Sequence, residues 1–541
     1  MKKIMKVLPM LLGVILLVPG CNQDKTPEDE YEKDYTLDEY TFIDVFKSSE
    51  ELFLRKYNRE TPFNVETKII NINQNIGDKN YIRINYVSNV NVIAYISYYN
   101  ASNKEENNTE TIFLKKDSNS FTMFLDGIRR GAKGNYNKVI TSIEIKNSDH
   151  ENTVNFTLKI LVISDRTYDQ SKTLYIKDGT MKFGAALSFG GCISYIERLG
   201  VDVVEYLDDN NNIVIDRDID TQDVNVITDH VNLVNTYDLG REIQQSYYWP
   251  VSSKNGYDYD PSQVVVPGEV NYNPIQCGSP AYKDPNTGKL TYNYPQIIDY
   301  VYKKDKIYVK AFGQDWYMRN QVDPIYFEST YTFGEDGVLK VNNKITSFSE
   351  FYDYDDLTLV GQEAPAFYAV HPLHNFYTET KGDGVIFDGA LGPIVNHDVD
   401  LKQKKNDPGV PGKYHYRLQS RYIPKKWCAF VNDDLFGLGI YSPNASFFTA
   451  SRGATSTKTT EGKNLETNPL MWDDTSGRTP PSQYTFNYGY INPAIDCRMV
   501  DFIPLEFNYA VFAGDTDEMN QAFGKLEESQ ELKTEIAWPQ R

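Results

Sequence analysis

The stretch YTFGEDGVLKVNNKI, residues 331–345, carries the clearest structural signal in this sequence. Apolar and polar residues alternate on both sides of Asp336-Gly337, as they do in strands with one buried face. An Asp-Gly pair between two alternating runs is a strong hairpin signal, because both residues tolerate the backbone angles of a tight turn. The stretch therefore predicts a β-hairpin.

Short alternating segments of the same kind recur along most of the chain. FNVETKIININ (63–73), YIRINYVS (81–88) and VNVIAYISYY (90–99) are early examples, and four more follow before Ser164. Asn, Asp, Gly and Ser separate the segments, which is typical of a β-sandwich. We expect an all-β protein with an N-terminal sandwich over residues 39–178 and a larger β region over residues 179–541.

Helical spacing is confined to two places. Part of TFIDVFKSSEELFLRKY (41–57) favours a short helix. Near the C-terminus, Asp515 and Glu518 fit a capping box that precedes an apolar stripe. The stripe consists of Met519, Ala522, Phe523 and Leu526.

The N-terminus carries an export signal. Lys2, Lys3 and Lys6 precede an apolar run, residues 7–18, that is too short to span a bilayer. The ending LVPGC resembles the lipobox of bacterial lipoproteins, so residues 1–21 are expected to form a signal peptide and Cys21 to become lipidated. Residues 22–38 are acidic and suit a solvated tether. We expect a lipoprotein of the outer membrane, on the cell surface or the periplasmic face.

Composition excludes one class of partner and is compatible with another. The formal charge of −20 argues against nucleic acid, because phosphate binding needs a basic stripe. The chain has 41 tyrosines, 27 phenylalanines and 5 tryptophans. Tyrosine suits sugar rings, which are apolar on their faces and polar at their edges. Strands are rich in tyrosine too, so composition alone does not establish sugar binding.

Several segments of the second region break the strand pattern. VNTYDLGREIQQSYY (234–248) is polar on both faces if it is a strand. Comparable segments combine amides, charges and aromatic rings beside Gly or Pro: FGGCISYIERLG, NPIQCGSPAY, FGQDWYMRN, GQEAPAFYAVHPLHNFY, KKWCAFVNDDLFGLGIYSPN and YGYINPAIDC. Segments that violate the binary pattern tend to be functional sites.

These segments carry a family resemblance. The run from GGCISYIE through NLVNTYDLGREIQQSYY, NPIQCGS, GQEAPAFYA and FGLGIYSPN resembles β-rich bacterial proteins of the galactose mutarotase-like, supersandwich type. Such proteins occur among carbohydrate-active enzymes and in polysaccharide-utilisation lipoproteins. The resemblance covers about residues 180–530 and implies a supersandwich after an accessory jelly-roll sandwich. No segment reproduces the family's catalytic pattern of carboxylate, histidine and arginine, so no catalytic residue is carried over.

The candidate chemistry therefore comes from residue types. Glycoside hydrolysis needs two carboxyl groups, roughly 5 Å apart for retention or 6.5–9.5 Å apart for inversion. Glu363 and Asp238 are the catalytic candidates, with His371 as a base. Glu242 and Glu506 are further acids in polar or apolar segments. Substrate binding is expected from Arg241, Gln244, Gln245, Tyr248, Trp249, Trp316, His374 and Trp427. Arg241 either pairs with Asp238 or clamps a substrate.

Metal and cofactor sites are weakly indicated. His371 and His374 would share a face only on a helix, which Pro372 disfavours, so no transition metal is expected. Residues 204–223 carry oxygen ligands suited to a structural calcium ion but lack the EF-hand pattern, so a solvated loop is the alternative. The four cysteines after Cys21 lack metal-like spacing. They allow three disulfide connectivities, and free thiols also remain open. No other cofactor motif is present.

Two functional classes remain. A carbohydrate-active hydrolase would cleave a poly- or oligosaccharide in a cleft of the second region. A non-catalytic glycan-binding lipoprotein would need the same aromatic platforms without convergent acids. A lyase with His371 or a tyrosine as base is a variant of the first class.

The lipid anchor can be tested directly. Cys21→Ala should release the protein from membranes, because lipidation at this residue is the only anchor that the sequence offers. Fractionation after a high-salt wash measures the effect, and a variant that still pellets with membranes would contradict the lipoprotein interpretation.

Overall fold

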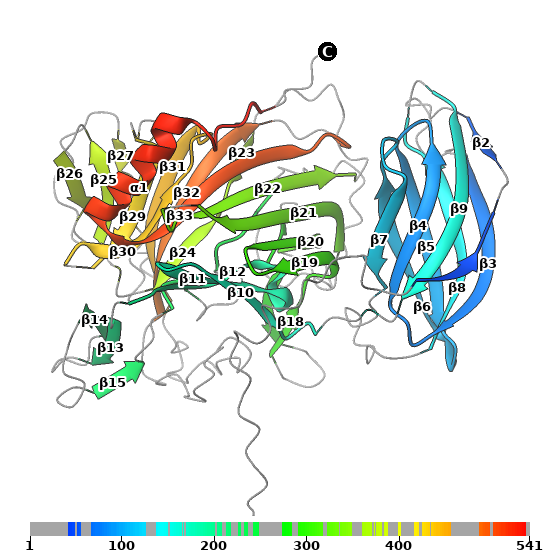
Figure 1. The fold of residues 1–541 in the computed structure, drawn as a ribbon, viewed down its shortest axis with the longest axis horizontal. Coiled ribbons are helices and arrows are strands. Elements are labelled where there is room, and N and C mark those ends of the chain that lie inside the picture. Colours follow the sequence, from blue (N-terminus) through cyan, green and yellow to red (C-terminus); the bar gives the residue numbers. More distant parts are fainter. Residues whose placement is uncertain are drawn as a thin grey trace, which may run out of the picture.

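In the computed structural model of the chain, the described residues form β-strands, one α-helix and a short 3-10 helix. The described residues are 42–48, 51–55, 66–125, 137–149, 152–164, 166, 169–200, 203–207, 213–217, 225–228, 232–235, 242–247, 273–283, 290–316, 322–334, 336–348, 360–370, 373, 375–380, 383–387, 399–401, 416–420, 423, 425–432, 434–455, 486–497 and 501–536. Their regular structure is nearly all β, in antiparallel sheets (Figure 1). The all-β prediction is therefore confirmed.

The N-terminal part is a sandwich of two sheets, drawn in blue and cyan in Figure 1. One sheet has the order β1 (Ile43–Phe46), β9 (Val154–Ser164), β4 (Tyr81–Ser88) and β7 (Ser120–Phe124), with β2 (Leu52–Leu54) also paired to β9. The other has the order β3 (Thr67–Gly77), β8 (Lys138–Asn147), β5 (Val92–Asn100) and β6 (Asn103–Leu114). Alternate side chains of both sheets, such as Ile84 and Ile143, share one core.

The short helix predicted within residues 41–57 is wrong. This segment forms β1 and β2, and both pair with β9. Pairing with β9 satisfies the backbone N–H and C=O groups of β1 and β2. The stabilisation from this pairing outweighs the weak helical preference of the local sequence.

A ten-stranded sheet forms most of the second region. Its order is β16 (Pro274–Ile275), β20 (Lys306–Asp315), β21 (Val322–Phe333), β22 (Leu339–Ser347), β33 (Leu505–Asp515), β30 (Phe436–Tyr441), β29 (Trp427–Val431), β25 (Asn375–Thr380) and β26 (Asp383–Phe387), with β19 (Ile297–Lys303) paired to β20. The predicted hairpin is confirmed, because β21 and β22 pair along their length and Gly337 has a φ of 74° in the turn.

A six-stranded sheet and three small sheets complete this region. The larger has the order β23 (Val360–Glu363), β32 (Phe486–Cys497), β31 (Phe447–Thr455), β28 (Tyr416–Ser420) and β27 (Val399–Leu401), with β24 (Phe367–Val370) also paired to β32. The small sheets are β10 (Thr173–Lys177), β11 (Met181–Ala186) and β12 (Cys192–Arg198); β14 (Ile213–Arg217), β13 (Val203–Leu207) and β15 (Asn225–Thr228); and β17 (Ser279–Lys283) with β18 (Leu290–Asn293). A short 3-10 helix, η4 (Leu187–Phe189), precedes β12.

Two sequence predictions concern segments of the small sheets. β10 ends just before residue 178 but pairs with β11, so this strand shares a sheet with the second region. The domain boundary near residue 178 stays a prediction. The paired strands β13 and β14 lie in the segment considered for calcium, and residues 208–212 between them lie outside the described residues.

The predicted C-terminal helix, α1 (Thr516–Ser529), is confirmed. Glu518 accepts a hydrogen bond from the Asp515 N–H at 2.9 Å, and the predicted apolar stripe is buried. The helix packs against β33 and β30 (Figure 1). Within the described residues, no helix is both long enough and apolar enough to cross a membrane.

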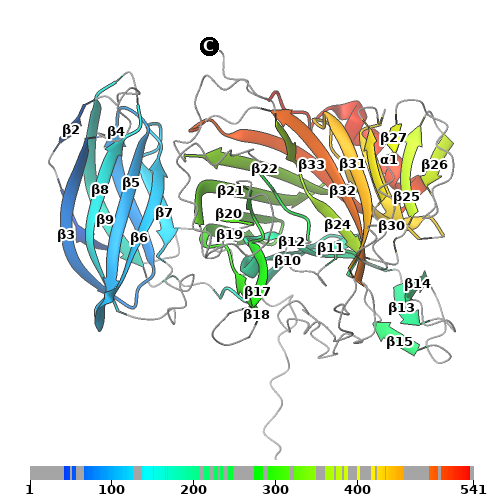
Figure 2. The ribbon, with the colours of Figure 1, turned by 180° about the vertical axis from the view of Figure 1, so that it is seen from behind.

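A buried ion pair joins the N-terminal sandwich to the second region, whose proximity both ribbon views show (Figures 1 and 2). Arg166 contacts Asp299 of β19 with 2.6 Å between Nη1 and Oδ1. The hydroxyls of Tyr81 and Thr122 donate to the other carboxylate oxygen of Asp299 at 2.9 and 2.8 Å. Nearby, the Phe113 N–H donates to the Tyr326 hydroxyl at 2.7 Å. The sandwich is therefore docked through specific buried polar contacts.

Removing Asp299 should destabilise this contact strongly. In Asp299→Ala, Arg166 stays buried without its carboxylate, so we expect a loss of about 3–5 kcal/mol in the free energy of unfolding, measured by urea titration. Lys525→Ala is the matched control, because it breaks an exposed ion pair with Asp336 without changing the turn residue and should cost less than about 1 kcal/mol. Equal small losses for both variants would contradict the docking role of Asp299.

Candidate functional site

The polar segment singled out in the sequence crosses the interior of the second region. Residues 242–247 form isolated bridges to three different elements, and these bridges join Ile243 to Ile193, Gln244 to Ala366, and Ser246 to Ile275. Each of the first two pairs exchanges two backbone hydrogen bonds of 2.9–3.1 Å. The segment therefore connects β12, the turn between β23 and β24, and β16.

The glutamine side chains of this segment form hydrogen bonds inside the second region. Gln245 Nε2 donates to the Ser329 hydroxyl at 2.8 Å and to the Glu328 carbonyl at 3.0 Å. Gln244 Oε1 accepts from the Cys277 N–H at 3.0 Å. Both side chains are buried, so the structure gives these amides, which were predicted to bind substrate, partners inside the protein. Because the pairing partner changes twice within residues 243–246, the segment lacks a regular ladder, and the Gln276 side chain accepts from the remaining Gln245 N–H.

Gln276 completes this network from the other side. Its Nε2 donates to the Gly190 carbonyl at 2.9 Å and to the Ser329 hydroxyl at 3.1 Å. Its Oε1 accepts from the Gln245 N–H at 3.2 Å. Gly190 has a φ of 64°, and a Cβ there would lie 2.2 Å from the Gln276 carbonyl oxygen, so this close approach requires glycine.

The two described tryptophans among the candidates differ in exposure. Trp427 is 1% exposed, with its ring 5.5 Å from both Tyr377 and Phe523, so it offers no open face to a sugar. Trp316 is half-buried directly after β20. The remaining candidates, Asp238, Arg241, Tyr248, Trp249, His371 and His374, lie outside the described residues.

The acids named in the sequence occupy three different surroundings. Glu506 lies on β33, paired with Lys344 at 3.5 Å, with a side chain 44% exposed. Glu242 is fully buried beside two cysteines. Glu363, at the end of β23, is 9% exposed, and the Tyr490 hydroxyl and the Asn492 amide both donate to its Oε1. Glu363 is therefore the described acid that sits among potential substrate-binding groups.

Strand register places a second acid on the same face as Glu363. Glu363 is opposite Ala494 and Gly361 is opposite Asp496 in the β23–β32 pair. Directly opposite residues, and residues two apart on one strand, share a face, so the backbone positions of Glu363 and Asp496 are diagonal neighbours roughly 7–8 Å apart. Side chains at such positions can bring two carboxyl groups to either side of one bond, as glycoside hydrolysis requires.

The same face carries aromatic and amide groups. Tyr368 is opposite Tyr490, and their ring centroids are 4.8 Å apart. We call Glu363, Tyr368, Tyr490, Asn492 and Asp496 the Glu363 face. The opposite face of these strands, including Phe367, Ile491 and Ile495, belongs to the main hydrophobic core. Asp496 was missed from sequence because only register reveals its neighbour. The signal was the placement of Tyr490, Asn492 and Asp496 on alternate positions of YGYINPAIDC, with Ala494 between the last two.

The interior network supports the Glu363 face. The turn between β23 and β24 is held on one side by the two hydrogen bonds between Ala366 and Gln244. On the other side, the Ala364 N–H donates to the Pro493 carbonyl at 3.0 Å. The backbone that carries Glu363 is thus fixed to both β32 and the crossing segment.

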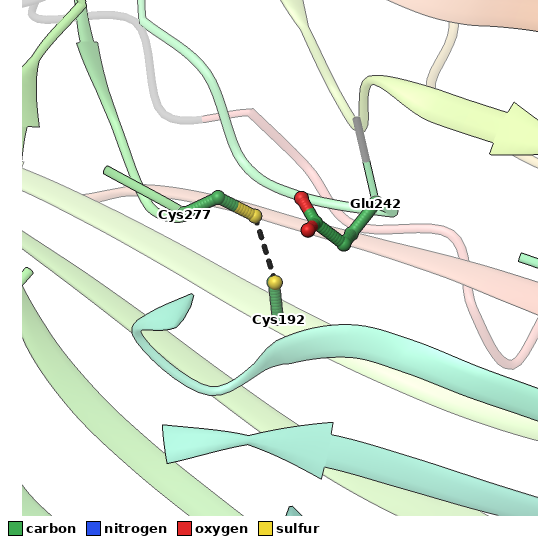
Figure 3. Close-up of side chains that lie close together, drawn as sticks. All are labelled: Cys192, Glu242 and Cys277. Atoms are coloured by element: carbon green, nitrogen blue, oxygen red, sulfur yellow. Dashed lines mark hydrogen bonds between the residues drawn. The ribbon is translucent and has the colours of Figure 1, made fainter. Parts of the chain in front are cut away.

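A separate cluster contains Cys192, Cys277 and Glu242, whose side chains converge in Figure 3. All three are fully buried, and their donor atoms lie within 4.8 Å of one another. Burial raises the pKa of Cys192 to about 11, and burial together with Cys192 and Glu242 raises the pKa of Cys277 well above its usual value. As free thiols, both would be protonated and poorly nucleophilic at neutral pH. No sequence spacing predicted this cluster.

Comparison with known proteins adds little. No family model and no curated protein matches the chain. Among solved structures, an alpha-mannosidase from Enterococcus faecalis V583 aligns over 93% of this chain and 46% of its own, with a TM-score of 0.26 and 7% sequence identity. The chain spans less than half the length of that protein, and a similarity this low carries no weight for function. The galactose mutarotase-like resemblance stays a prediction.

The structural role of the buried amides can be tested at Gln276. Gln276→Leu keeps the volume but leaves the Gln245 N–H and the Gly190 carbonyl without this partner, so we expect a loss of about 2–4 kcal/mol of unfolding free energy. Gln74→Leu, at a partly exposed glutamine of β3, should change stability by less than about 0.5 kcal/mol. A Gln276 variant as stable as this control would show that the network is dispensable.

Proposed function

We propose that the chain is a carbohydrate-active protein that hydrolyses glycosidic bonds of a poly- or oligosaccharide on the Glu363 face. The observation that carries this proposal is the pair of carboxyl groups, Glu363 and Asp496, at diagonal positions of one sheet face. Hydrolysis of a glycoside requires two such groups on either side of the bond that breaks.

The surroundings of the two acids suit different roles. Glu363 is the more buried of the two acids, and burial favours the protonated form of a carboxyl group, so it is the candidate proton donor to the leaving oxygen. Tyr490 and Asn492 hold it in place through Oε1. Asp496 is partly exposed and is the candidate group that acts on water or directly on the anomeric carbon. When the glycosidic C–O bond breaks, the leaving oxygen takes the Glu363 proton. Water supplies the hydroxyl group of the new sugar end, and its other proton passes to Asp496 if Asp496 activates the water, or back to Glu363 if Asp496 attacks the anomeric carbon.

The neighbouring groups suit a sugar ligand. The half-buried Tyr490 combines an apolar ring face with a hydroxyl edge, its ring packs against the buried Tyr368, and Asn492 adds an amide. Such a mixture of flat apolar surface and a few placed polar groups is usual in carbohydrate and other small-molecule sites. His371, which follows β24 directly, and Asp238, Arg241, Tyr248, Trp249 and His374 stay proposals for the remainder of the site.

A glycan-binding protein without catalysis is the second candidate. The contact of Glu363 with both Tyr490 and Asn492 favours it, because a carboxyl group already engaged by two donors can simply orient a ligand. In either case, we propose attachment to the outer membrane through lipid on Cys21 alone.

Substitution of the two acids tests the proposal. Glu363→Gln keeps size and hydrogen bonding but removes proton transfer, so turnover should fall by at least ~100-fold while glycan affinity is retained. Asp496→Asn should reduce turnover similarly. The measurements are reducing-end release and binding across a glycan panel, with a thermal melt to confirm folding.

Glu506→Gln is the control, because it alters an exposed acid of β33 that lies outside the Glu363 face. Its turnover should equal that of the unsubstituted protein. Unchanged turnover in a folded Glu363→Gln variant would eliminate this acid. Glycan binding by the unsubstituted protein without product release would favour the binding protein.

A further inference from the structure

The cysteine cluster has no part in the proposed hydrolysis and implies a separate chemistry. Cys192 begins β12, Cys277 follows β16, and Glu242 belongs to the segment that crosses between them (Figure 3). The Sγ atoms of Cys192 and Cys277 are 2.7 Å apart, closer than non-bonded sulfur atoms pack. Both side chains are fully buried from bulk solvent.

The backbones on both sides of this pair are fixed by other contacts. The Cys277 N–H donates to Gln244 Oε1, and the neighbouring Gln276 amide donates to the Gly190 carbonyl. On the Cys192 side, the Gly191 carbonyl accepts from the Tyr331 hydroxyl at 2.7 Å. The approach of the two sulfur atoms is thus set by contacts that do not depend on the sulfurs themselves.

We propose that Cys192 and Cys277 are joined by a disulfide bond that ties the start of β12 to the segment after β16. An organic disulfide is the oxidant. The thiolate of one cysteine attacks it and releases one thiolate, and the second cysteine then attacks the mixed disulfide and releases the other. Two protein thiols become one disulfide, the oxidant becomes two thiols, and both electrons pass to it. Because both sulfurs are buried in the folded protein, this exchange takes place before residues 242–247 close over the pair.

A zinc site formed by the same cluster is the rival. Zinc accepts two thiolates and a carboxylate, and Glu242 supplies the carboxylate. Two thiolates bound tetrahedrally at about 2.3 Å from zinc would lie about 3.8 Å apart, which is farther than the sulfurs lie here. Structural zinc sites have four protein ligands, and the described residues supply three. The geometry favours the disulfide.

The bond would stabilise the frame of the Glu363 face. It closes a loop between residues 85 positions apart, and this loop contains the crossing segment that holds Ala366. Cross-links that close long loops restrict the unfolded chain most. The inference does not require catalysis, since the same frame would serve a binding site.

Peptide mapping tests the bond in the full-length chain. The protein is purified without reductant and unfolded in excess alkylating reagent, then digested and analysed by mass spectrometry, with zinc measured on the native sample. We expect the Cys192 and Cys277 peptides to be joined, whereas Cys428 and Cys497, which are also buried, should be alkylated and serve as internal controls. Alkylated Cys192 and Cys277 would overturn the proposal, and one zinc ion per chain would then identify the metal site.

Stability provides a second readout. Cys192→Ala, Cys277→Ala and the double variant should each lower the melting temperature by a similar amount, at least about 5 °C, because either substitution removes the whole bond. Reductant should lower the melting temperature of the unsubstituted protein and leave these three variants unchanged. Cys428→Ala, which removes a buried thiol outside the pair, should keep the response to reductant. If the variants do not fold, an unsubstituted protein that is insensitive to reductant during unfolding would still contradict the bond.

Discussion

The satisfaction of buried backbone groups in residues 242–247 is the constraint on which the second region depends. This segment runs through the interior and meets β12, the turn after β23 and β16 within six residues. A regular strand would satisfy its backbone along one neighbour, but this segment changes neighbours, and its Gln245 N–H donates to the Gln276 side chain. The Gln244 and Gln245 side chains in turn bond the Cys277 N–H and the Glu328 carbonyl. An unpaired group in this position would cost about as much as a lost buried hydrogen bond. The glutamines of this segment and Gln276 are therefore needed because the chain crosses the interior here without a regular strand partner.

The same segment links the core to both candidate sites. Through Ala366 it fixes the turn that follows Glu363, and through Glu242 it reaches the two buried cysteines. The acids of the Glu363 face lie on strands whose opposite face is part of the main core, so their positions follow from packing and register. Chemistry that needs two carboxyl groups at a defined separation benefits from such a rigid support.

Local sequence patterns correctly predicted the elements whose structure is set by interactions between residues close in sequence. Alternation and Asp336-Gly337 predicted the β21–β22 hairpin, and a capping box with an apolar stripe predicted α1. Residues 41–57 failed because pairing with β9 decides their conformation. The sequence also marked Glu363 and the segment YGYINPAIDC. That Glu363 and Asp496 are neighbours, however, depends on the register between strands about 130 residues apart. The approach of Cys192 to Cys277 likewise depends on the tertiary fold. Gln244, Gln245 and Trp427 looked like ligand-binding groups because residue type alone does not distinguish a buried network from a surface platform.

The central claim is that Glu363 and Asp496 flank one glycosidic bond. A crystal structure of the Glu363→Gln variant with a bound oligosaccharide tests it most directly. The account predicts a glycosidic oxygen within about 3 Å of the residue 363 side chain, with Asp496 directed at the adjoining anomeric carbon. A sugar bound elsewhere on the molecule, or one that reaches Glu363 but leaves Asp496 without contact, would contradict it.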